Sequence, residues 1–464
     1  MVFSSLEFLF LFLPVMLLAY FSVPWRLKNI VLLLGSLFFY AWGEPVYVLL
    51  MLFSITINYF LALVIDRSPG TAKAKAAIVT SIATSLLLLG YFKYAGFVVG
   101  IINDVFGTDI TDPHLPLPIG ISFYTFQVLS YTIDVYRGRV PAQHNFIALA
   151  MYISLFPQLI AGPIVRYKDI VADLTGRSHS LALFSEGAQR FVVGLAKKVL
   201  IANGIGQLWE AAIATSEPSV ALAWLGIVAF TFQIYFDFSG YSDMAIGLGR
   251  MVGFRFPENF DYPYISQTVT EFWRRWHISL GQWFRDYVYI PLGGNRVSYA
   301  KWVRNVFVVW FLTGLWHGAA WSFALWGVYF GVLLWMERSF LATVLARLPR
   351  PLRHIYVLLI IMISWTLFQL DTPGQILGYL GDMFGLSGVP LGNAEAAYLF
   401  RSNLVLLFVA TIGSMPILRN LNRRIGTKPV VQRAALPVAH GFLLVASYAY
   451  LVDSSFNPFL YFRF

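Results

Sequence analysis

Uncharged apolar segments about as long as a lipid bilayer is thick recur along this chain, and they limit what it can fold into. A helix that crosses the ~30 Å hydrocarbon core needs about 20 mostly apolar residues. Apolar residues make up 58% of the 464 residues, and charged residues 12%, about half of the roughly 25% usual in soluble domains. The chain is therefore predicted to be an all-α, polytopic integral membrane protein. The predicted spans are 8–25, 29–43, 45–65, 76–92, 115–133, 145–165, 218–236, 354–370, 402–418 and 434–452.

The longest segment without Asp, Glu, Lys or Arg covers residues 305–336. As one helix it would be ~48 Å long at a rise of 1.5 Å per residue, which exceeds the hydrocarbon core. A helical hairpin that turns near Gly318 fits the bilayer better. With this hairpin the chain has about twelve predicted crossings.

Loop charges predict an orientation. The loops 103–113 and 371–395 carry acidic residues and no Lys or Arg, whereas basic residues collect near Arg26, Lys73 and Arg423. Since Lys and Arg favour cytoplasmic loops, both termini are expected outside the cytoplasm, which requires an even number of crossings. The same rule accounts for much of the net charge of +10.

The segment 145–165 leaves two topologies open. If it crosses the membrane, several basic residues after it fall on the outer side, against the charge rule. Alternatively the segment, which contains Pro157 and Gly162, dips in and returns, and residues 191–209 cross instead. We prefer the second version. Both versions imply a cavity, because irregular backbone at membrane depth persists only inside protein or beside water.

Several classes of chemistry lack their usual residues. The chain has no Cys, so disulfides, thiolate nucleophiles and Cys-ligated metals are excluded. It has no phosphate-binding glycine motif, no G-x-S-x-G nucleophile elbow and no H-E-x-x-H, so neither nucleotide hydrolysis nor a metal site is indicated. Lipid contacts account for the aromatic content without binding to nucleic acid.

An aromatic and basic segment, 258–304, contains the first candidate histidine. On a continuous helix, Trp273, Trp276, His277 and Leu280 would share one face. One interpretation is an interfacial amphipathic helix, with Trp at the level of the lipid headgroups and Arg on lipid phosphate. That interpretation does not explain why His277 lies on the apolar face.

His317 lies near the middle of the long uncharged segment, between Gly314 and Gly318. An ionisable group at such depth is costly and marks a candidate functional site. The alternative is a neutral histidine that is hydrogen-bonded between helices. The small neighbours can serve either close helix packing or a substrate.

With no cysteine, histidine is the best available base for transferring an acyl group to a hydroxyl, because imidazole accepts a proton near neutral pH. Among the carboxylates within the spans, Asp237 could orient a histidine or form a salt bridge with Arg274 or Arg275. Asp237 and Asp243 lie about 120° apart around a helix, so they are not an obvious acid/base pair. The other histidines are expected at the surface or in packing roles: His114, His144, His179, His354 and His440.

At these residues the chain resembles the membrane-bound O-acyltransferase family, in particular its bacterial exopolysaccharide branch. The resemblance extends, with the hydropathy pattern, over nearly the whole chain. The matching pieces are Phe236-Asp237-Phe238-Ser239-Gly240-Tyr241-Ser242-Asp243, Pro257-Glu258-Asn259-Phe260, Trp273 to Gly294, Trp316-His317-Gly318 and Asn457 to Phe464.

The resemblance implies a single membrane-embedded domain over residues 1–464 around a central tunnel, with its core motif region at 230–340. It implies an O-acetyltransferase in the bacterial inner membrane, with His317 as the invariant histidine and His277 as a second polar position. The acetyl group would pass from a cytoplasmic donor, acetyl-CoA, to an extracytoplasmic acetyltransferase partner that modifies a polysaccharide such as alginate. No bound cofactor is expected, and the partners are membrane lipids, that protein and the polymer. Candidate donor-binding residues are Asp237, Glu271, Arg274, Trp276, Asn295 and Trp316.

Three alternatives stay open at the sequence level. The first is transfer of D-alanine from a carrier protein toward teichoic acid. The second is a membrane transporter, which should show paired broken spans in two related halves. The third is a structural scaffold, for which His317 would be dispensable. Within the enzymatic reading, His317 is expected to act as a base, and a transient acyl-histidine is the other possibility.

Overall fold

The computed structural model describes residues 1–425, 428, 430–453 and 456–460. Their backbone forms helices and loops, and strand pairing among them is limited to one antiparallel bridge between Phe260 and Trp276. The all-α class predicted from the sequence is confirmed. The last residues of the predicted C-terminal motif, 461–464, lie outside the described part.

The chain divides into two compact units. Unit 1 comprises Met1–Phe191 and Met244–Pro257, and unit 2 comprises Val192–Asp243 and Glu258–Phe464. Helices α9 and α11 contribute residues to both units.

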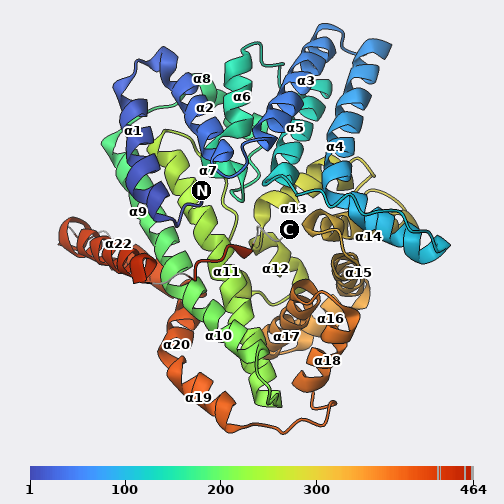
Figure 1. Ribbon diagram of the computed structural model, residues 1–464, viewed down its shortest axis with the longest axis vertical. Helices are drawn as coiled ribbons and strands as arrows, with labels where there is room; N and C mark the ends of the chain where they lie inside the picture. Colours follow the sequence, from blue (N-terminus) through green and yellow to red (C-terminus); the bar gives the residue numbers. More distant parts are fainter. Residues whose placement is uncertain (426–427, 429, 454–455, 461–464) are drawn as a thin grey trace. The chain divides into compact units, whose positions relative to one another are not determined.

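In unit 1, the long helices α3, α4 and α5 pack side by side (Figure 1). The hydroxyl of Thr71 accepts a hydrogen bond from the amide of Ala74 and so caps α4, as Ser and Thr do at many helix starts. The elements are η1 (Phe8–Phe12), α1 (Leu13–Ser22), α2 (Trp25–Ala41), α3 (Tyr47–Arg67), α4 (Ala72–Phe106), α5 (Ile121–Tyr136), α6 (Phe146–Ser154), α7 (Phe156–Leu159), α8 (Tyr167–Gly176) and the start of α9 (Leu181–Ala196).

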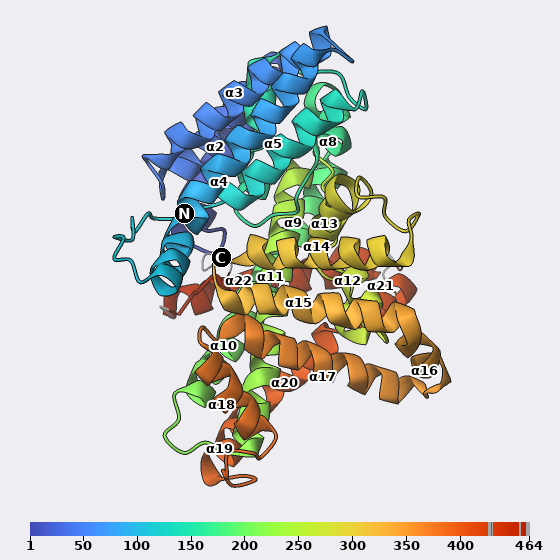
Figure 2. The ribbon, with the colours of Figure 1, turned by 90° about the vertical axis from the view of Figure 1, so that its right-hand side faces the viewer.

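In unit 2, α14 and α15 run side by side and α17 packs against α15 (Figure 2). The elements up to α15 are η2 (Lys197–Ala202), α10 (Asn203–Ile213), α11 (Val220–Met251), η3 (Pro263–Ile265), α12 (Val269–Arg275), α13 (Ile278–Phe284), η4 (Arg285–Tyr289), α14 (Tyr299–His317) and α15 (Trp321–Met336). The remaining elements are η5 (Glu337–Leu341), α16 (Ala342–Arg347), α17 (Arg350–Gln369), α18 (Pro373–Met383), α19 (Ala394–Ser402), α20 (Leu404–Gly413), α21 (Ile417–Ile425), η6 (Val431–Ala435) and α22 (Leu436–Asp453).

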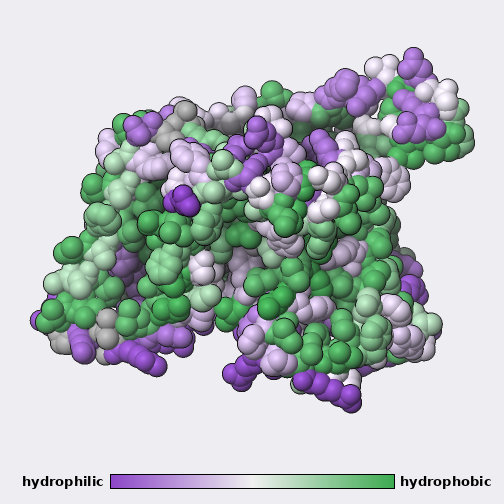
Figure 3. All heavy atoms as spheres, turned by 90° about the horizontal axis from the view of Figure 1, so that it is seen from below, coloured by the Kyte–Doolittle hydropathy of each residue, from purple (hydrophilic) through white to green (hydrophobic). Residues whose placement is uncertain are grey.

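The surface is that of a protein in contact with lipid. In the described residues, seven helices are long and apolar enough to cross a membrane, or up to eight if the bent pair α19 and α20 forms one span. Exposed apolar side chains cover much of the face shown in Figure 3. A multi-pass membrane protein is therefore supported. The predicted count of about twelve crossings is not confirmed, because several predicted spans form short or broken helices.

The structure of residues 145–213 agrees with the preferred topology, in which 145–165 does not cross the membrane. Residues 145–165 form the short helices α6 and α7, and nearly all their side chains are buried. The continuous segment Leu181–Ile213, by contrast, is long and apolar enough to span. The chain breaks at Leu155, where the backbone leaves the helical region before Pro157.

The predicted hairpin at residues 305–336 is confirmed. Helix α14 ends at His317, Gly318 is its C-cap with extended backbone, and α15 begins at Trp321. A Cβ atom on Gly314 would collide with the carbonyl oxygen of Phe323, and one on Gly318 with the Phe323 ring. These glycines therefore serve close packing of the two helices, one of the two roles considered from the sequence.

Candidate active site

His317 lies at the C-terminal end of α14 in an aromatic environment. Its side chain is buried, and its ring centroid lies 5.0 Å from Trp316, 5.2 Å from Trp326 and 5.2 Å from Phe368, all in near-perpendicular arrangements. Trp326 belongs to α15 and Phe368 to α17. Three aromatic rings thus surround the imidazole and limit its access to water.

His277 does not lie on a continuous helix, and the helix predicted through Trp273, Trp276 and Leu280 is wrong. Helix α12 ends at Arg275, and His277 is the N-cap of α13 with φ 45° and ψ 53°. A non-glycine residue in this left-handed region is uncommon and strained, and such residues cluster at active sites.

The break at His277 has a local cause in the backbone. The amide of Asp261 donates to the carbonyl of Arg275, and the amide of Ile278 donates to the carbonyl of Asn259. The residues between α12 and α13 therefore pair with residues 259–261 instead of continuing the helix. As a result the His277 side chain is directed to the buried Phe238 ring, with 4.8 Å between the ring centroids.

Asn259 determines which ring nitrogen of His277 carries the proton. Its Oδ1 accepts from the backbone amide of Ser279 at 3.2 Å and from the Ser279 hydroxyl at 2.9 Å, which identifies this atom as the acceptor. His277 Nδ1 lies 3.1 Å from the same oxygen, so Nδ1 carries the proton and Nε2 carries the lone pair. Burial lowers the pKa of the His277 imidazole to about 3, so the ring is neutral at pH 7.

Trp316 connects the two histidines. Its ring centroid lies 5.9 Å from His277 and 5.0 Å from His317, and its side chain is buried. The two predicted histidines, 40 residues apart in the sequence, therefore both lie next to the indole of Trp316 within unit 2. The structure brings together three of the predicted site residues: His277, His317 and Trp316.

Asp237 pairs with neither Arg274 nor Arg275, so that predicted salt bridge is wrong. Its Oδ1 lies 2.8 Å from Lys198 Nζ, and its Oδ2 accepts from the amide of Leu460 at 2.9 Å. Lys198 and its neighbour Lys197, which pairs with Asp243 at 2.6 Å, lie on the π-helix η2. A π-helix has more residues per turn than an α-helix, so its side chains point in other directions than those of an α-helix with the same sequence.

The other predicted donor-binding residues make contacts with residues other than the two histidines. Glu271 accepts from the amide of Gln267 and pairs with Arg275 at 3.0 Å, which stabilises the start of α12. Arg274 is exposed, and Asn295 is exposed and accepts hydrogen bonds from Tyr289 and Arg338. Trp276 is buried against Phe260, Phe272 and Trp365.

Sequence reasoning did not assign functions to several residues of this site. Asn259 belongs to the Pro257-Glu258-Asn259-Phe260 motif. The sequence indicates a family resemblance for this motif but no role for the Asn259 side chain. Trp326 is fully buried, and its Nε1–H has no hydrogen-bond partner. A buried donor without an acceptor beside His317 is a group that can bind an oxygen of a substrate.

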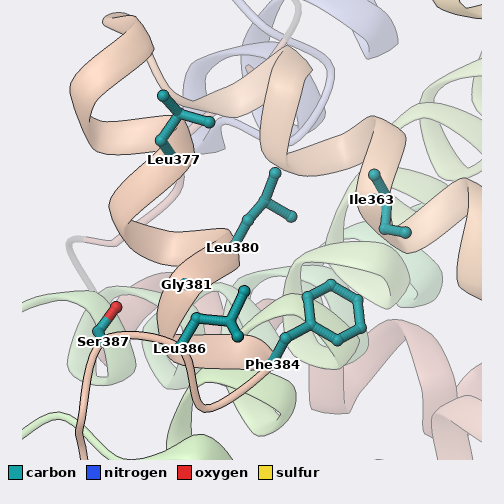
Figure 4. A pocket seen from close by; sticks show the side chains of 7 residues that line it. All are labelled: Ile363, Leu377, Leu380, Gly381, Phe384, Leu386 and Ser387. Atoms are coloured by element: carbon teal, nitrogen blue, oxygen red, sulfur yellow. The ribbon is translucent and has the colours of Figure 1, made fainter.

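A groove in unit 2 lies elsewhere, between α17, α18 and the turn that follows α18. Figure 4 shows Leu380, Phe384 and Leu386 directed toward the same space, whose volume is about 480 Å³. Its lining contains neither His277 nor His317. Among the described residues no group of three or more His, Asp or Glu side chains could hold a metal ion.

Comparison with known proteins shows the family of this chain. The model of the membrane-bound O-acyltransferase family matches residues 37–370. The chain is 45% identical to a probable alginate O-acetylase AlgI of Pseudomonas aeruginosa, over 89% of this chain and 79% of that protein. It is 40% identical to the corresponding protein of Azotobacter vinelandii over the full length of both.

A third relative acts on another polymer by name. The peptidoglycan O-acetyltransferase of Helicobacter pylori is 35% identical over 84% of this chain and 81% of that protein. The matched region includes both histidines and the rings of Trp316, Trp326 and Phe368 beside them. The chain belongs to the membrane-bound O-acyltransferase family and is an O-acyltransferase of the membrane.

Proposed function

We propose that this protein transfers an acetyl group from a cytoplasmic donor, acetyl-CoA, across the inner membrane for the O-acetylation of an extracytoplasmic polysaccharide such as alginate. The observation that carries the proposal is the contact of His277 and His317 with the same indole, Trp316, in a buried aromatic environment. The named activities of the relatives described above support acetyl as the group and a cell-envelope polymer as its destination.

In this proposal His317 is the base. The acceptor hydroxyl oxygen forms a bond to the carbonyl carbon of the thioester while the carbon–sulfur bond breaks. His317 takes the hydroxyl proton and passes it to the leaving thiolate, so protons balance over the step. The aromatic rings around His317 exclude water, which would otherwise hydrolyse the donor.

His277 and Trp326 assist without exchanging the proton of the acceptor. With its pKa at about 3, His277 is neutral, and its Nε2 can accept a hydrogen bond from the acceptor hydroxyl or from the donor and so orient it. The indole Nε1–H of Trp326 can donate to the carbonyl oxygen, where negative charge develops in the transition state. The acceptor hydroxyl of this step belongs to the extracytoplasmic acetyltransferase partner. A hydroxyl of the polymer then takes the acetyl group from that ester, and the partner regains its hydroxyl.

The finer architecture belongs to the same proposal. A single domain over residues 1–464, a core motif region at 230–340, a central tunnel and about twelve crossings stay predictions. The transporter and scaffold alternatives are set aside, because the chain belongs to an enzyme family. Transfer of D-alanine is the alternative that the experiment must distinguish.

The test uses inverted inner-membrane vesicles from cells that make the protein, its polymer and its partner. Acetyl-CoA labelled in the acetyl group, or a carrier protein loaded with labelled D-alanine, is added to the exposed cytoplasmic face. The proposal predicts that labelled acetyl-CoA gives alkali-labile, labelled acetate on the polymer inside the vesicles. The carrier protein loaded with D-alanine should give no label on the polymer. Labelled D-alanine on polymer, without labelled acetate, would contradict it.

A further inference from the structure

Two buried cations lie together in unit 1, beside the phenol of Tyr20. Arg177 is 5% exposed and Lys28 is 9% exposed. Lys28 Nζ lies 4.4 Å from the centroid of the Tyr20 ring, and the Arg177 guanidinium carbon lies 5.7 Å from it. His179 Nε2 is 2.7 Å from the Tyr20 hydroxyl. Three groups that carry or can take up positive charge thus surround one ring.

The groups that accept hydrogen bonds from these cations are neutral. Arg177 donates to the Tyr20 hydroxyl at 2.9 Å and to Asn29 Oδ1 at 2.8 Å, and Lys28 donates to the Tyr20 carbonyl at 2.7 Å. The ion pairs found among the described residues include neither cation. Arg177 Nη2 is buried and has no hydrogen-bond partner. Burial of two like charges against neutral acceptors is unfavourable, and an anion would offset it.

The local backbone adds to the positive potential. Lys28 lies in the first turn of α2, whose N-terminal amides receive no side-chain cap. The N-terminus of a helix carries a partial positive charge and favours anions over cations. Burial, and then the charge of Arg177, lower the pKa of Lys28; burial, and then the charges of Lys28 and Arg177, lower the pKa of His179.

Exposed aromatic rings indicate the depth of this cluster. Trp25 is 41% exposed and its ring centroid lies 4.9 Å from the Arg177 guanidinium carbon, while Phe21 is 45% exposed and lies 5.3 Å from Lys28 Nζ. Trp side chains collect at the level of the lipid headgroups. Basic pockets between helices at this depth bind anionic headgroups. A lipid phosphate is therefore the anion that this position favours.

We propose that Lys28, Arg177 and His179 form a binding site for the phosphodiester of an anionic phospholipid, with the Trp25 and Phe21 rings against its glycerol and upper acyl chains. The site is independent of the acyltransferase chemistry, since all its residues belong to unit 1. Arg177 also joins α1, α2 and α8 through its neutral acceptors, so the bound lipid would stabilise the packing of these helices.

The test measures the thermal unfolding midpoint of the purified full-length protein in neutral detergent, with added phosphatidylglycerol, phosphatidylcholine or inorganic phosphate. Lys28→Met keeps most of the aliphatic stem and removes the charge, and Arg26→Met removes an exposed charge from the same helix as the matched control. Arg177 is left intact, because its loss would also disturb folding.

The proposal predicts that phosphatidylglycerol raises the midpoint of the wild type and of Arg26→Met at the same concentrations, and that phosphatidylcholine and inorganic phosphate do not. Lys28→Met should require roughly fivefold more phosphatidylglycerol for the same rise, the effect of one lysine at a membrane surface. An equal response of Lys28→Met and the wild type would overturn the site. An equal rise with inorganic phosphate would overturn the lipid assignment.

Discussion

The Trp316 ring lies 5.9 Å from the His277 ring, centroid to centroid, although the two residues belong to different helical segments and are far apart in the sequence. This contact joins the strained turn before α13 to the end of α14, where His317 lies. Both imidazoles are buried against one indole. This burial suits the acyl transfer proposed above, which needs a site poor in water.

Asn259 positions His277 and should therefore affect turnover more than donor binding. Asn259→Ala leaves three donors without their acceptor, His277 Nδ1 and the amide and hydroxyl of Ser279. A loss of about 1–3 kcal/mol of stability is expected, together with a fall in kcat of at least tenfold at unchanged KM for the acyl donor. Steady-state acetyl transfer and thermal unfolding measure both effects.

The matched control for Asn259 is Asn305→Ala, since Asn305 is also fully buried and donates to the carbonyls of Leu292 and Gly294. It should lose comparable stability and keep most of its kcat. Equal losses of kcat in the two variants would show that Asn259 acts only through folding.

Trp326→Phe keeps an aromatic ring beside His317 and removes the indole donor. If Nε1–H stabilises the developing negative charge on the carbonyl oxygen, kcat should fall roughly 100- to 1,000-fold with little change in stability. Trp209→Phe is the matched control, because the Trp209 indole is buried in unit 2, lacks a hydrogen-bond partner and contacts Phe230 and Tyr379. Full activity in Trp326→Phe would exclude the donor role.

Burial of a neutral His277 should make stability depend on pH. The pKa of this imidazole is about 3 in the folded protein and ~6.5 in an unfolded chain. Between these values only the unfolded state takes up the proton, so acid lowers the free energy of unfolding there, and the effect is absent above about pH 6.5.

His277→Gln removes this dependence. Between about pH 7 and about pH 4.5, the wild type should lose about 2.5 kcal/mol more of its unfolding free energy than the variant does. Equilibrium unfolding in detergent at the two pH values measures the difference. A difference between the proteins that does not change with pH would mean that His277 is accessible to protons in the folded state.

The buried pair of Lys198 and Asp237 is expected to stabilise the fold and the docking of the segment that contains Leu460. Asp237→Asn leaves Lys198 without its carboxylate, and Lys198→Met leaves Asp237 without its cation. Each change should cost about 3–5 kcal/mol, and the double variant should cost less than the sum of the two. Thermal unfolding of the three variants tests this coupling.

The activity of the same variants separates this role from catalysis. Activity should fall in proportion to the folded fraction, with kcat per folded molecule retained. A fall in kcat of Asp237→Asn without a loss of stability would instead make Asp237 part of the catalytic machinery.

The sequence predicted the features that follow from one-dimensional patterns. The α-helical class and the hairpin at Gly318 could be inferred because charge is costly in lipid and glycine permits close packing. The roles of His277 and His317 stay predictions. The continuous helix through Trp276 and His277 was wrong, because pairing with residues 259–261 outweighs the helical pattern. No local pattern indicates such a long-range contact.

The partners of the charged residues were equally hard to predict. A salt bridge of Asp237 with Arg274 or Arg275 was one of two predicted roles, whereas Lys198 on the π-helix η2 forms the ion pair with Asp237. The role of Asn259 also depends on tertiary structure, since its neighbours in space are His277 and Ser279. The predicted count of about twelve crossings is not confirmed, since apolar segments such as α6 and α7 form short buried helices.

The central claim is that His317 transfers the proton that acyl transfer requires. The direct measurement is the rate at which labelled acetyl from acetyl-CoA becomes ester-bound in a bilayer system that contains the purified protein, its partner and its polymer. His440→Ala is the matched control, because His440 also lies in an apolar helix, where its Nδ1 contacts the carbonyl of Leu436. We predict that His317→Ala loses at least 100-fold in rate while its unfolding midpoint and membrane insertion match those of an active His440→Ala. Ester-bound acetyl at the wild-type rate in His317→Ala would contradict the account.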